Sequence, residues 1–231
     1  MPNSLPRFRA DSARRCAVSP LSRSRRKNDL QSAVGDRRPL TARAGVLGLQ
    51  GDFAEHLATL DRLGVEGVDV RRPEQLDEIE ALIIPGGEST TIGKLASQYG
   101  IIEKLRDRVA EGMPVWGTCA GAIFIAKDVP CHPHPLASLM DMTVERNAFG
   151  RQVDSFEADL DVKQLGPKPF HAVFIRAPRI RRVGPGVEVL ARLGDGTVVG
   201  ARQGRLLATS FHPELTHDGR FHRYFLSLGK R

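Results

Sequence analysis

The feature that most constrains this chain is a short apolar run that enters a turn flanked by glycines and leaves it as an apolar helix. The stretch spans residues 113–124 and reads MPVWGTCAGAIF, with Cys119 at the turn. Gly117 and Gly121 relieve the crowding that a tight corner imposes on its neighbours. A strand-to-helix turn of this kind is a nucleophile elbow, here with sulfur in place of a hydroxyl, and it pushes its central side chain out at the top of a sheet. The stretch therefore predicts an α/β fold that presents a reactive cysteine.

The helix start after Cys119 suits the sulfur for catalysis. It supplies unpaired backbone N–H groups and the positive end of a dipole, which favour thiolate over thiol and can hold a developing oxyanion. The N–H of Ala120 is the natural first donor. An arbitrary cysteine is more often a small buried hydrophobic residue. The two flanking glycines favour the reactive interpretation for Cys119.

A cysteine nucleophile needs a base, and His212 is the best candidate among the seven histidines. It stands in the tripeptide His212-Pro213-Glu214. In an extended segment, residues two apart project to the same side, so Glu214 could orient the imidazole, and Pro213 disfavours helix at His212. A surface turn could have the same sequence. Together with Cys119, however, the tripeptide predicts a nucleophile, base and orienting carboxylate of the kind used in acyl transfer.

The first half of the chain alternates between strand-like and helix-like segments. Apolar runs of strand length stand at 44–49, 68–70 and 81–84, and the last is fully apolar, as in a sheet covered on both faces. Apolar residues at helical spacing fill 53–63, and a second helical segment runs from about Ile92 to Glu111 with a break expected at Gly100. This alternation predicts parallel βαβ units.

The second half of the chain changes to short β-like runs. These lie at 142–145, 153–160, 172–175, 187–190, 198–201 and 206–210. They suit an extended, partly antiparallel sheet, and the last of them delivers His212 at its carboxyl end. Residues 221–228 are expected to form a closing helix.

The loop at 85–91 follows an apolar strand and contains Gly86, Gly87, Glu88 and Ser89. In open α/β sheets, ligands bind at the carboxyl ends of the strands, and this loop would leave the same edge as Cys119. The two glycines let the backbone approach a ligand closely, and the polar side chains add recognition. The alternative is a Gly-Gly turn in which Ser89 or Thr90 caps the next helix.

Charge and composition divide the chain at about residue 43. Residues 1–43 hold 11 of the 34 Lys and Arg residues but 3 of the 27 Asp and Glu residues, so 23 basic and 24 acidic residues remain after them. The remainder, 44–231, is nearly neutral and gives no charge argument for nucleic-acid binding. No apolar run approaches the ~20 residues of a membrane span. We expect a disordered basic extension over 1–43 and one catalytic domain over 44–231.

The basic extension has three explanations that its composition leaves open. It could be an organelle transit peptide, a segment that contacts an anionic partner, or upstream sequence translated from a misplaced start codon. Three cysteines, Cys16, Cys119 and Cys131, form no disulfide framework and fit a reducing, cytoplasmic setting. The loop at 131–135, CHPHP, has no second ligand cluster with familiar spacing, so we expect no metal site.

The order of three motifs resembles class I, triad-type glutamine amidotransferases. They are 85–90 (PGGEST), 117–121 (GTCAG) and 212–214 (HPE). Three further stretches, 48–51 (GLQG), 144–157 (VERNAFGRQVDSFE) and 173–178 (VFIRAP), are similar to the glutaminase subunits of pyridoxal 5′-phosphate synthase. The resemblance covers about residues 44–228. It implies a three-layer, flavodoxin-like α/β fold with a central, mostly parallel sheet flanked by helices.

The resemblance also implies roles for individual residues. Cys119 would be the nucleophile, His212 the base and Glu214 its orienting carboxylate. The glutamine-binding positions of the family fall on Gly87, Glu88, Ser89, Arg146, Ile175 and Arg176. The oxyanion region falls on Gln50, Gly86, Gly87 and Ala120. Without the motif match, both arginines would be interpreted as solvated surface charges.

The implied reaction is hydrolysis of L-glutamine to glutamate and ammonia through a cysteine thioester, with no metal or organic cofactor. The ammonia would pass to a barrel-shaped synthase subunit that builds pyridoxal phosphate. That partner would activate the glutaminase by turning the peptide between Gly86 and Gly87. The alternatives are the glutaminase subunit of another amidotransferase, a cysteine peptidase or stress protein of the same fold, and a basic nucleic-acid-binding or scaffold protein.

Overall fold

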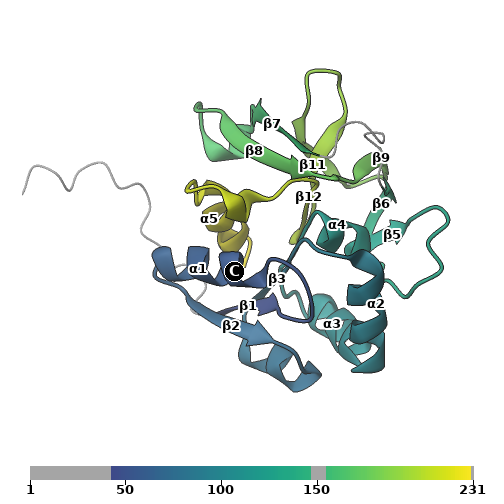
Figure 1. Cartoon of the computed structure of the whole chain (residues 1–231). Helices are drawn as coiled ribbons and strands as arrows, with labels where there is room; N and C mark the ends of the chain where they lie inside the picture. The colour runs from purple at the N-terminus through teal and green to yellow at the C-terminus, as the bar shows by residue number, and fades with distance from the viewer. Residues whose placement is uncertain (1–42, 147–154, 230–231) are drawn as a thin grey trace, which may run out of the picture. The chain divides into compact units, whose positions relative to one another are not determined.

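The computed structural model describes residues 43–146 and 155–229 (Figure 1). The disorder expected for residues 1–42 and part of the family motif, residues 147–154, lie outside this range. Arg43, which we assigned to the extension, is the first residue of a strand and pairs with Glu66. Among the described residues, no helix has the length and apolar character needed to cross a membrane.

Five parallel strands form the half of the sheet that carries the elbow. They are β1 (Arg43–Leu47), β2 (Glu66–Val70), β3 (Ala81–Ile84), β4 (Val115–Thr118) and β12 (Leu206–Thr209). Their spatial order is β2-β1-β3-β4-β12, and every neighbouring pair in it is parallel. The chain therefore returns from its far end to place β12 beside β4. This arrangement brings the segment before His212 next to the segment before Cys119.

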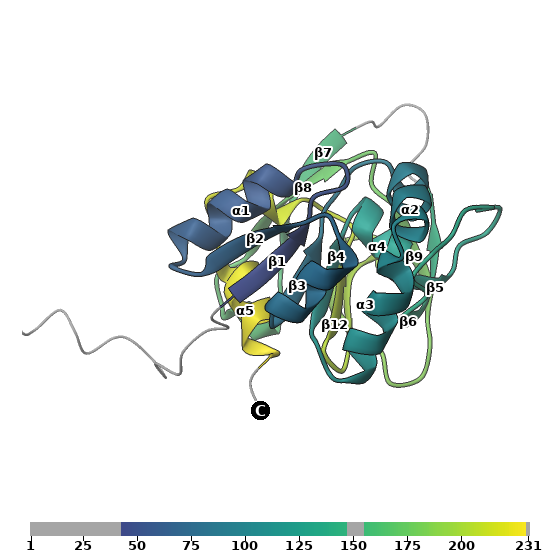
Figure 2. The same cartoon turned by 90° about the horizontal axis from the view of Figure 1, so that it is seen from below.

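Helices cover both faces of this parallel half, as Figure 2 shows. On one face lie α1 (Phe53–Arg62) and α5 (Arg220–Ser227), and on the other lie α2 (Ser89–Gln98), α3 (Ile101–Ala110) and α4 (Ala120–Ile125). Alternate strand residues separate two cores: Ile83 packs with the α1 and α5 side, and Leu82 with the α2, α3 and α4 side. The predicted three-layer α/β architecture is therefore confirmed.

The predicted helix from about Ile92 to Glu111 is two helices. Gly100 adopts φ +70° between α2 and α3, so the expected break is present. The first helix begins earlier than expected, at Ser89, because the carboxylate of Glu88 accepts hydrogen bonds from the N–H groups of Thr90 and Thr91. Glu88 is thus the capping residue, and neither Ser89 nor Thr90 is.

The rest of the sheet is mixed. It contains β5 (Ala126–Asp128), β6 (Met140–Glu145), β9 (Arg179–Val183), β10 (Glu188–Arg192) and β11 (Val198–Gln203). From β12 the order continues β11-β9-β6-β5, with β10 paired to β11, and all of these pairs except β5 with β6 are antiparallel. A separate antiparallel hairpin is formed by β7 (Ser155–Leu160) and β8 (Phe170–Ile175). The predicted, partly antiparallel second half is confirmed.

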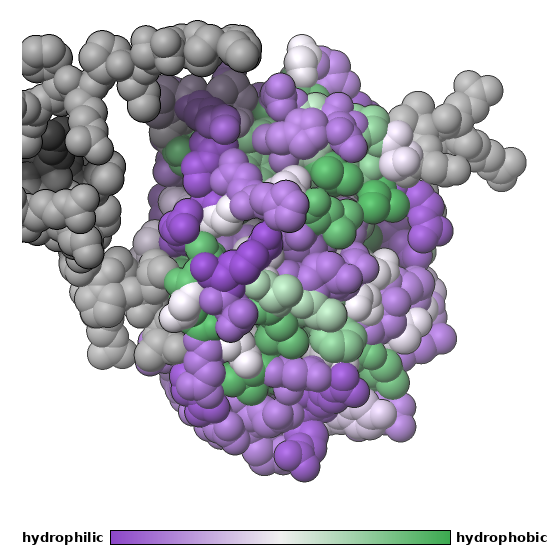
Figure 3. Space-filling view, turned by 60° about the vertical axis from the view of Figure 1, so that its left-hand side comes forward, coloured by the Kyte–Doolittle hydropathy of each residue, from purple (hydrophilic) through white to green (hydrophobic). Residues whose placement is uncertain are grey.

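Most large apolar side chains of the described residues lie in the two cores. Tyr99, Ile175 and Leu215 are the large hydrophobic residues that remain exposed among those described. On the face drawn in Figure 3, hydrophobic residues form small groups among hydrophilic ones. The hydrophobic effect therefore stabilises mainly the two cores between the sheet and the helices. These cores fix the strand ends that carry the site.

Candidate active site

Cys119 occupies the corner between β4 and α4 in a strained backbone conformation. Its φ is +47° and its ψ is −104°, values that a residue with a side chain rarely adopts. Two backbone hydrogen bonds hold the corner: the N–H of Cys119 donates to Thr209 O at 2.8 Å, and Cys119 O accepts from the N–H of Ala122 at 3.1 Å. Strain of this kind persists at functional sites where surrounding structure enforces it. The predicted elbow is confirmed.

The two glycines around the corner are required by close packing. A Cβ on Gly117 would lie 2.4 Å from the backbone carbon of Gly121, and a Cβ on Gly121 would lie 2.0 Å from Ile84 O. Helix α4 therefore sits directly against β3 and β4, with no room for a methyl group at either position. This close approach is the physical reason for the Gly-x-x-x-Gly spacing around Cys119.

His212 and Glu214 lie beside the elbow, and both are 4% exposed. His212 Nδ1 is 2.7 Å from Glu214 Oε1. Burial acts to lower the pKa of His212, but hydrogen bonds to Cys119 and Glu214 and the charges of both outweigh it and raise the pKa to about 10. The imidazole is therefore protonated at neutral pH, so that it sets a positive charge beside the sulfur. The predicted nucleophile, base and carboxylate are brought together.

The backbone around this pair is not the extended segment that we expected. Pro213 to Leu215 form a 3₁₀ turn, η3 (Pro213–Leu215), and His212 is its cap at φ −105° and ψ 87°. Proline suits the first position of such a turn because its fixed φ is already helical and its missing N–H would have no partner there. Glu214 nevertheless reaches His212, by the turn instead of by the two-residue period of a strand.

Asp52 is a further carboxylate at the site, and sequence reasoning missed it. Its Oδ2 lies 3.3 Å from His212 Nδ1, and its side chain is partly exposed in the pocket. Asp52, His212 and Glu214 are the group of three among the described residues whose ligand atoms are close enough for a metal ion. His212 Nδ1 is already hydrogen-bonded to Glu214, so we interpret the cluster as a hydrogen-bonding arrangement. The position of Asp52, just after the first parallel strand, was the available signal.

A pocket of about 380 Å³ opens in front of the sulfur, a volume within the usual range for small-ligand sites. Ten of the predicted site residues line it, together with Asp52, Ile123 and Pro178. The ten are Gln50, Gly87, Glu88, Ser89, Cys119, Ala120, Arg146, Ile175, Arg176 and His212. Two predicted residues, Gly86 and Glu214, do not line the pocket. Both lie next to His212, which does.

Two loops approach closely on one side of this pocket. Gln50 Oε1 accepts a hydrogen bond from the N–H of Glu88 at 2.6 Å. Gly87 adopts φ +148°, and a Cβ there would lie 2.3 Å from Gln50 Oε1, so only glycine fits. Gly86 O accepts from the N–H of Asp52 at 3.2 Å. This bond fixes the orientation of the peptide between Gly86 and Gly87.

Two charged side chains, Glu88 and Arg146, line the pocket. Arg146 Nη2 lies 3.3 Å from Glu88 Oε1, and Arg146 Nη1 lies 3.3 Å from His132 Nδ1. Burial acts to raise the pKa of Glu88, but hydrogen bonds from Thr90 and Thr91 outweigh it and lower the pKa to about 2. Glu88 is therefore ionised and can pair with a cationic group of a ligand as well as with Arg146.

The β7–β8 hairpin delivers the remaining residues. Ile175 ends β8, and its carbonyl oxygen is 3.9 Å from Cys119 Sγ. Arg176 follows at φ +43°, a second strained position on the pocket wall. A segment outside the main sheet therefore closes the pocket over the nucleophile.

Comparison with known proteins agrees with this geometry. A protein of Herpetosiphon aurantiacus named pyridoxal 5′-phosphate synthase subunit PdxT is 60% identical over 187 residues, which cover 80% of this chain and 98% of that protein. The protein of the same name from Thermus thermophilus is 61% identical over 186 residues, covering 80% and 96%. A crystal structure described as glutamine amidotransferase matches with a TM-score of 0.77 at 60% identity, covering 80% of this chain and 98% of that one. Residues 46–229 match the model of the SNO glutamine amidotransferase family, and the chain belongs to that family.

Proposed function

We propose that this chain hydrolyses L-glutamine to L-glutamate and ammonia, as the glutaminase subunit of a pyridoxal 5′-phosphate synthase. The observation that carries the proposal is the elbow cysteine in one pocket of about 380 Å³ with a histidine whose pKa is raised to about 10. Relatives named as PdxT subunits, about 60% identical over nearly their whole length, support the pathway.

The first half of the reaction forms a thioester. The sulfur of Cys119 attacks the side-chain amide carbon of glutamine, and the amide oxygen becomes an oxyanion. His212 then gives its proton to the departing nitrogen, which leaves as ammonia when the C–N bond breaks. Glu214 accepts the hydrogen bond from His212 Nδ1, so that the other ring nitrogen is directed to the sulfur and the leaving group.

The second half returns the enzyme to its starting state. A water molecule gives a proton to the now neutral His212 and attacks the thioester carbon. The tetrahedral intermediate collapses, the C–S bond breaks and glutamate leaves. The charge of Glu214 stabilises the imidazolium at each stage in which it forms.

Binding of glutamine uses the charged wall of the pocket. Glu88, ionised because of its two capping hydrogen bonds, faces the amino group of the substrate, and Arg146 and Arg176 face its carboxylate. Ser89 is 3% exposed and its hydroxyl has no partner among the described residues, so the hydroxyl is available to the substrate. The carbonyl of Ile175 lies near the sulfur, where the amide nitrogen would arrive.

The oxyanion requires convergent N–H donors, and one of them is Ala120 at the start of α4. The second is the peptide between Gly86 and Gly87, whose orientation depends on the hydrogen bond from Asp52 to Gly86 O. A barrel-shaped synthase subunit that binds at this face would turn that peptide and receive the ammonia. The glutaminase domain includes Arg43, the first residue of β1, and residues 1–42 are dispensable for folding and catalysis.

The experiment is a glutaminase assay of the purified full chain with and without the synthase subunit of the same source. The expected result is slow hydrolysis alone and a rise in kcat with the partner, and no activity for Cys119→Ala in either case. Loss of one oxyanion donor typically costs about 10²- to 10³-fold, which sets the size of the rise. Full turnover alone, unchanged by a partner shown to bind, would exclude gating. Failure to hydrolyse glutamine in the complex would exclude the function.

A further inference from the structure

Glu214 contacts two histidines, and the proposed mechanism uses one of them. Its Oε1 faces His212. Its buried Oε2 lies 3.3 Å from the Nε2 of His56 but has no partner with hydrogen-bond geometry among the described residues. His56 projects from α1 and is 0% exposed. Its Nδ1 lies 3.0 Å from the Nε2 of His222, which projects from α5 and is also 0% exposed. A line of buried polar side chains therefore runs from α5 through α1 to the carboxylate behind the pocket.

The surroundings of this line keep both of its histidines neutral. His56 and His222 pack edge-on against the indole of Trp116, with ring centroids 5.9 and 5.0 Å away. Burial, together with the nearby His222 and His212, lowers the pKa of His56 well below its ordinary value. Burial and the charge of Arg62 lower the pKa of His222 to about 3. Thr118, at 3.4 Å from His56 Nε2, adds no charge.

A neutral imidazole carries one N–H and one bare nitrogen, so the line can be hydrogen-bonded in two directions. If His222 Nε2–H donates to His56 Nδ1, then the proton of His56 is on Nε2, which lies 3.3 Å from Glu214 Oε2 and 3.4 Å from Thr118 Oγ1. The bare Nδ1 of His222 then has no partner among the described residues. If His56 Nδ1–H donates instead, a bare nitrogen faces the carboxylate and His222 Nδ1–H is a buried donor without a partner. An unpaired buried donor is costly, and so is a lone pair facing a carboxylate. The first direction is therefore favoured.

We propose that His56 and His222 are positioning residues of the active site. His222 donates a hydrogen bond to His56, which places the N–H of His56 Nε2 beside the otherwise unpaired Oε2 of Glu214 and holds the carboxylate by this polar contact. This inference rests on the proposed roles of Cys119, His212 and Glu214. With Oε2 held by His56, the carboxylate cannot turn, so Oε1 stays on His212 Nδ1–H. The other ring nitrogen of His212 is then fixed toward Cys119.

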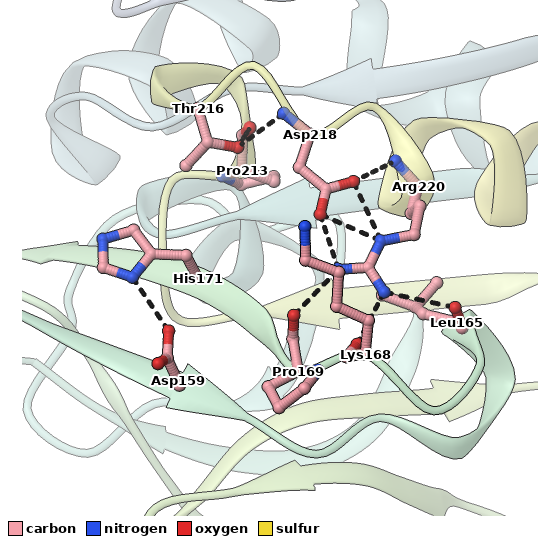
Figure 4. A network of polar contacts seen from close by, with 9 residues as sticks. All are labelled: Asp159, Leu165, Lys168, Pro169, His171, Pro213, Thr216, Asp218 and Arg220. Atoms are coloured by element: carbon pink, nitrogen blue, oxygen red, sulfur yellow. Dashed lines mark hydrogen bonds and ion pairs between the residues drawn. The ribbon is translucent and has the colours of Figure 1, made fainter.

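Figure 4 shows the polar contacts of Arg220, which lies close to the far end of the line in the sequence. Arg220, two residues before His222, donates to Lys168 O at 2.6 Å and to Pro169 O at 2.9 Å, and pairs with Asp218 at 2.6 Å. These bonds tie the first turn of α5 to the segment before β8. His222 therefore starts the line from a fixed position.

The test separates hydrogen bonding from packing at His56. The amide N–H of glutamine reaches about as far as Nε2, so His56→Gln keeps the donor to Glu214, whereas His56→Leu fills similar space without one. Orienting hydrogen bonds behind a site are typically worth about 10- to 100-fold in activity. In the complex with the synthase subunit, kcat is expected to fall by this factor in His56→Leu, with KM for glutamine unchanged, and to recover to within a few-fold of wild type in His56→Gln.

The pH dependence of kcat is a second measurement, and a packing defect at position 56 would not change it. Without the donor from His56, Glu214 is a weaker partner for His212, so the alkaline limb of kcat shifts to lower pH in His56→Leu and stays in place in His56→Gln. The titratable and charged groups that face this network are His222, Arg62, His212, Asp52 and Cys119. None of them changes between the two variants.

Two further variants distinguish a specific effect at His56 from a folding defect. His171→Leu, on the exposed side of β8, is a matched histidine-to-leucine change and is expected to behave as wild type. If His56→Leu does not fold, His56→Asn replaces it, because its shorter amide reaches His222 but not Glu214, and the same loss is expected. Wild-type kcat and pH profile in the folded Leu or Asn variant would overturn the inference. Wild-type activity in Cys119→Ala or His212→Ala would instead overturn the proposed function.

Discussion

The two sides of Glu214 hold histidines in opposite protonation states. On the pocket side, the pKa of His212 is raised to about 10, and on the core side the pKa of His222 is lowered to about 3 and that of His56 is also lowered. All three rings are almost fully buried. Burial alone would therefore make all three neutral, and it does not account for the difference.

The different neighbours of each imidazole ring account for the difference in pKa. His212 lies beside a thiol, and its Nδ1 is 2.7 Å from Glu214 and 3.3 Å from Asp52. His56 approaches one carboxylate oxygen, at the longer distance of 3.3 Å, and His222 contacts His56 and the aromatic ring of Trp116. A protonated imidazole is useful where a leaving group must receive a proton, and a neutral imidazole is useful where a hydrogen bond must have one direction. In the proposed mechanism, the same type of side chain thus supplies the acid on one side of the carboxylate and supports the carboxylate on the other.

The largest loss of activity is expected when the sulfur of Cys119 is removed. Cys119→Ala and Cys119→Ser are expected to lose glutamine hydrolysis by about 10⁴-fold or more while the fold survives, because loss of a nucleophile removes the covalent path. A glutaminase assay and a thermal melt check both halves of this expectation. Labelling with 6-diazo-5-oxonorleucine is expected on Cys119. An adduct mainly on the exposed Cys131, or normal hydrolysis by the serine variant, would refute the assignment.

Substitutions of His212 and Glu214 are expected to lower kcat by different amounts. His212→Ala removes proton transfer and should cost about 10²- to 10⁴-fold in kcat, and Glu214→Gln should cost less because it removes orientation and charge support. Steady-state kinetics of both variants in the synthase complex make the comparison. Small and equal losses would mean that the tripeptide 212–214 is only a turn.

The lowered pKa of His222 should make the free energy of unfolding depend on pH. The folded pKa of His222 is below its unfolded value, so the unfolded chain binds the proton first and stability falls as pH drops below about 6.5. At about pH 5 this single group costs about 2 kcal/mol relative to neutral pH, and His222→Phe removes that loss. Urea unfolding of both proteins at the two pH values measures the difference, with the partly exposed His134→Phe as control. An equal loss in wild type and His222→Phe would contradict a neutral His222.

The smallest effect is expected at the rim. Asp52 is partly exposed, and an exposed ion pair is worth about 1 kcal/mol or less, so Asp52→Asn should lower kcat/KM by less than about fivefold. The loss of a negative charge near His212 should also move the alkaline limb of the profile to slightly lower pH. A pH titration of kcat/KM tests this. A loss as large as that of Glu214→Gln would make Asp52 an equal partner of the base.

Short-range patterns predicted most of the parallel half and the reacting groups. The elbow at Cys119 and the tripeptide at His212 each depend on a few neighbouring residues, and their meeting follows from β4 and β12 being adjacent and parallel. The short strands were harder. We missed β9 because its sequence, Arg179–Val183, has three arginines and one buried apolar residue, and β5 because it has three residues.

The support behind the triad was not predictable from sequence. His56 and His222 are 166 positions apart, and they meet because α1 and α5 pack on the same face of the sheet beside Trp116. In the sequence, each is one polar residue on an amphipathic helix. Arg146 was found through its motif, but its ion pair with Glu88, 58 positions away, depends on where β6 ends relative to α2. Contacts between elements required the structure.

The most direct test of the central contrast is ¹⁵N NMR of the full chain labelled at histidine, with signals assigned through the variants at positions 56, 212 and 222. At about pH 7.5, His212 is expected to be protonated on both ring nitrogens, and His56 and His222 are expected to be neutral with the proton on Nε2. On acidification to about pH 5, the two core rings should not titrate, because their pKa values are lowered. A neutral His212 at about pH 7.5, or a proton on Nδ1 of His56, would contradict the account.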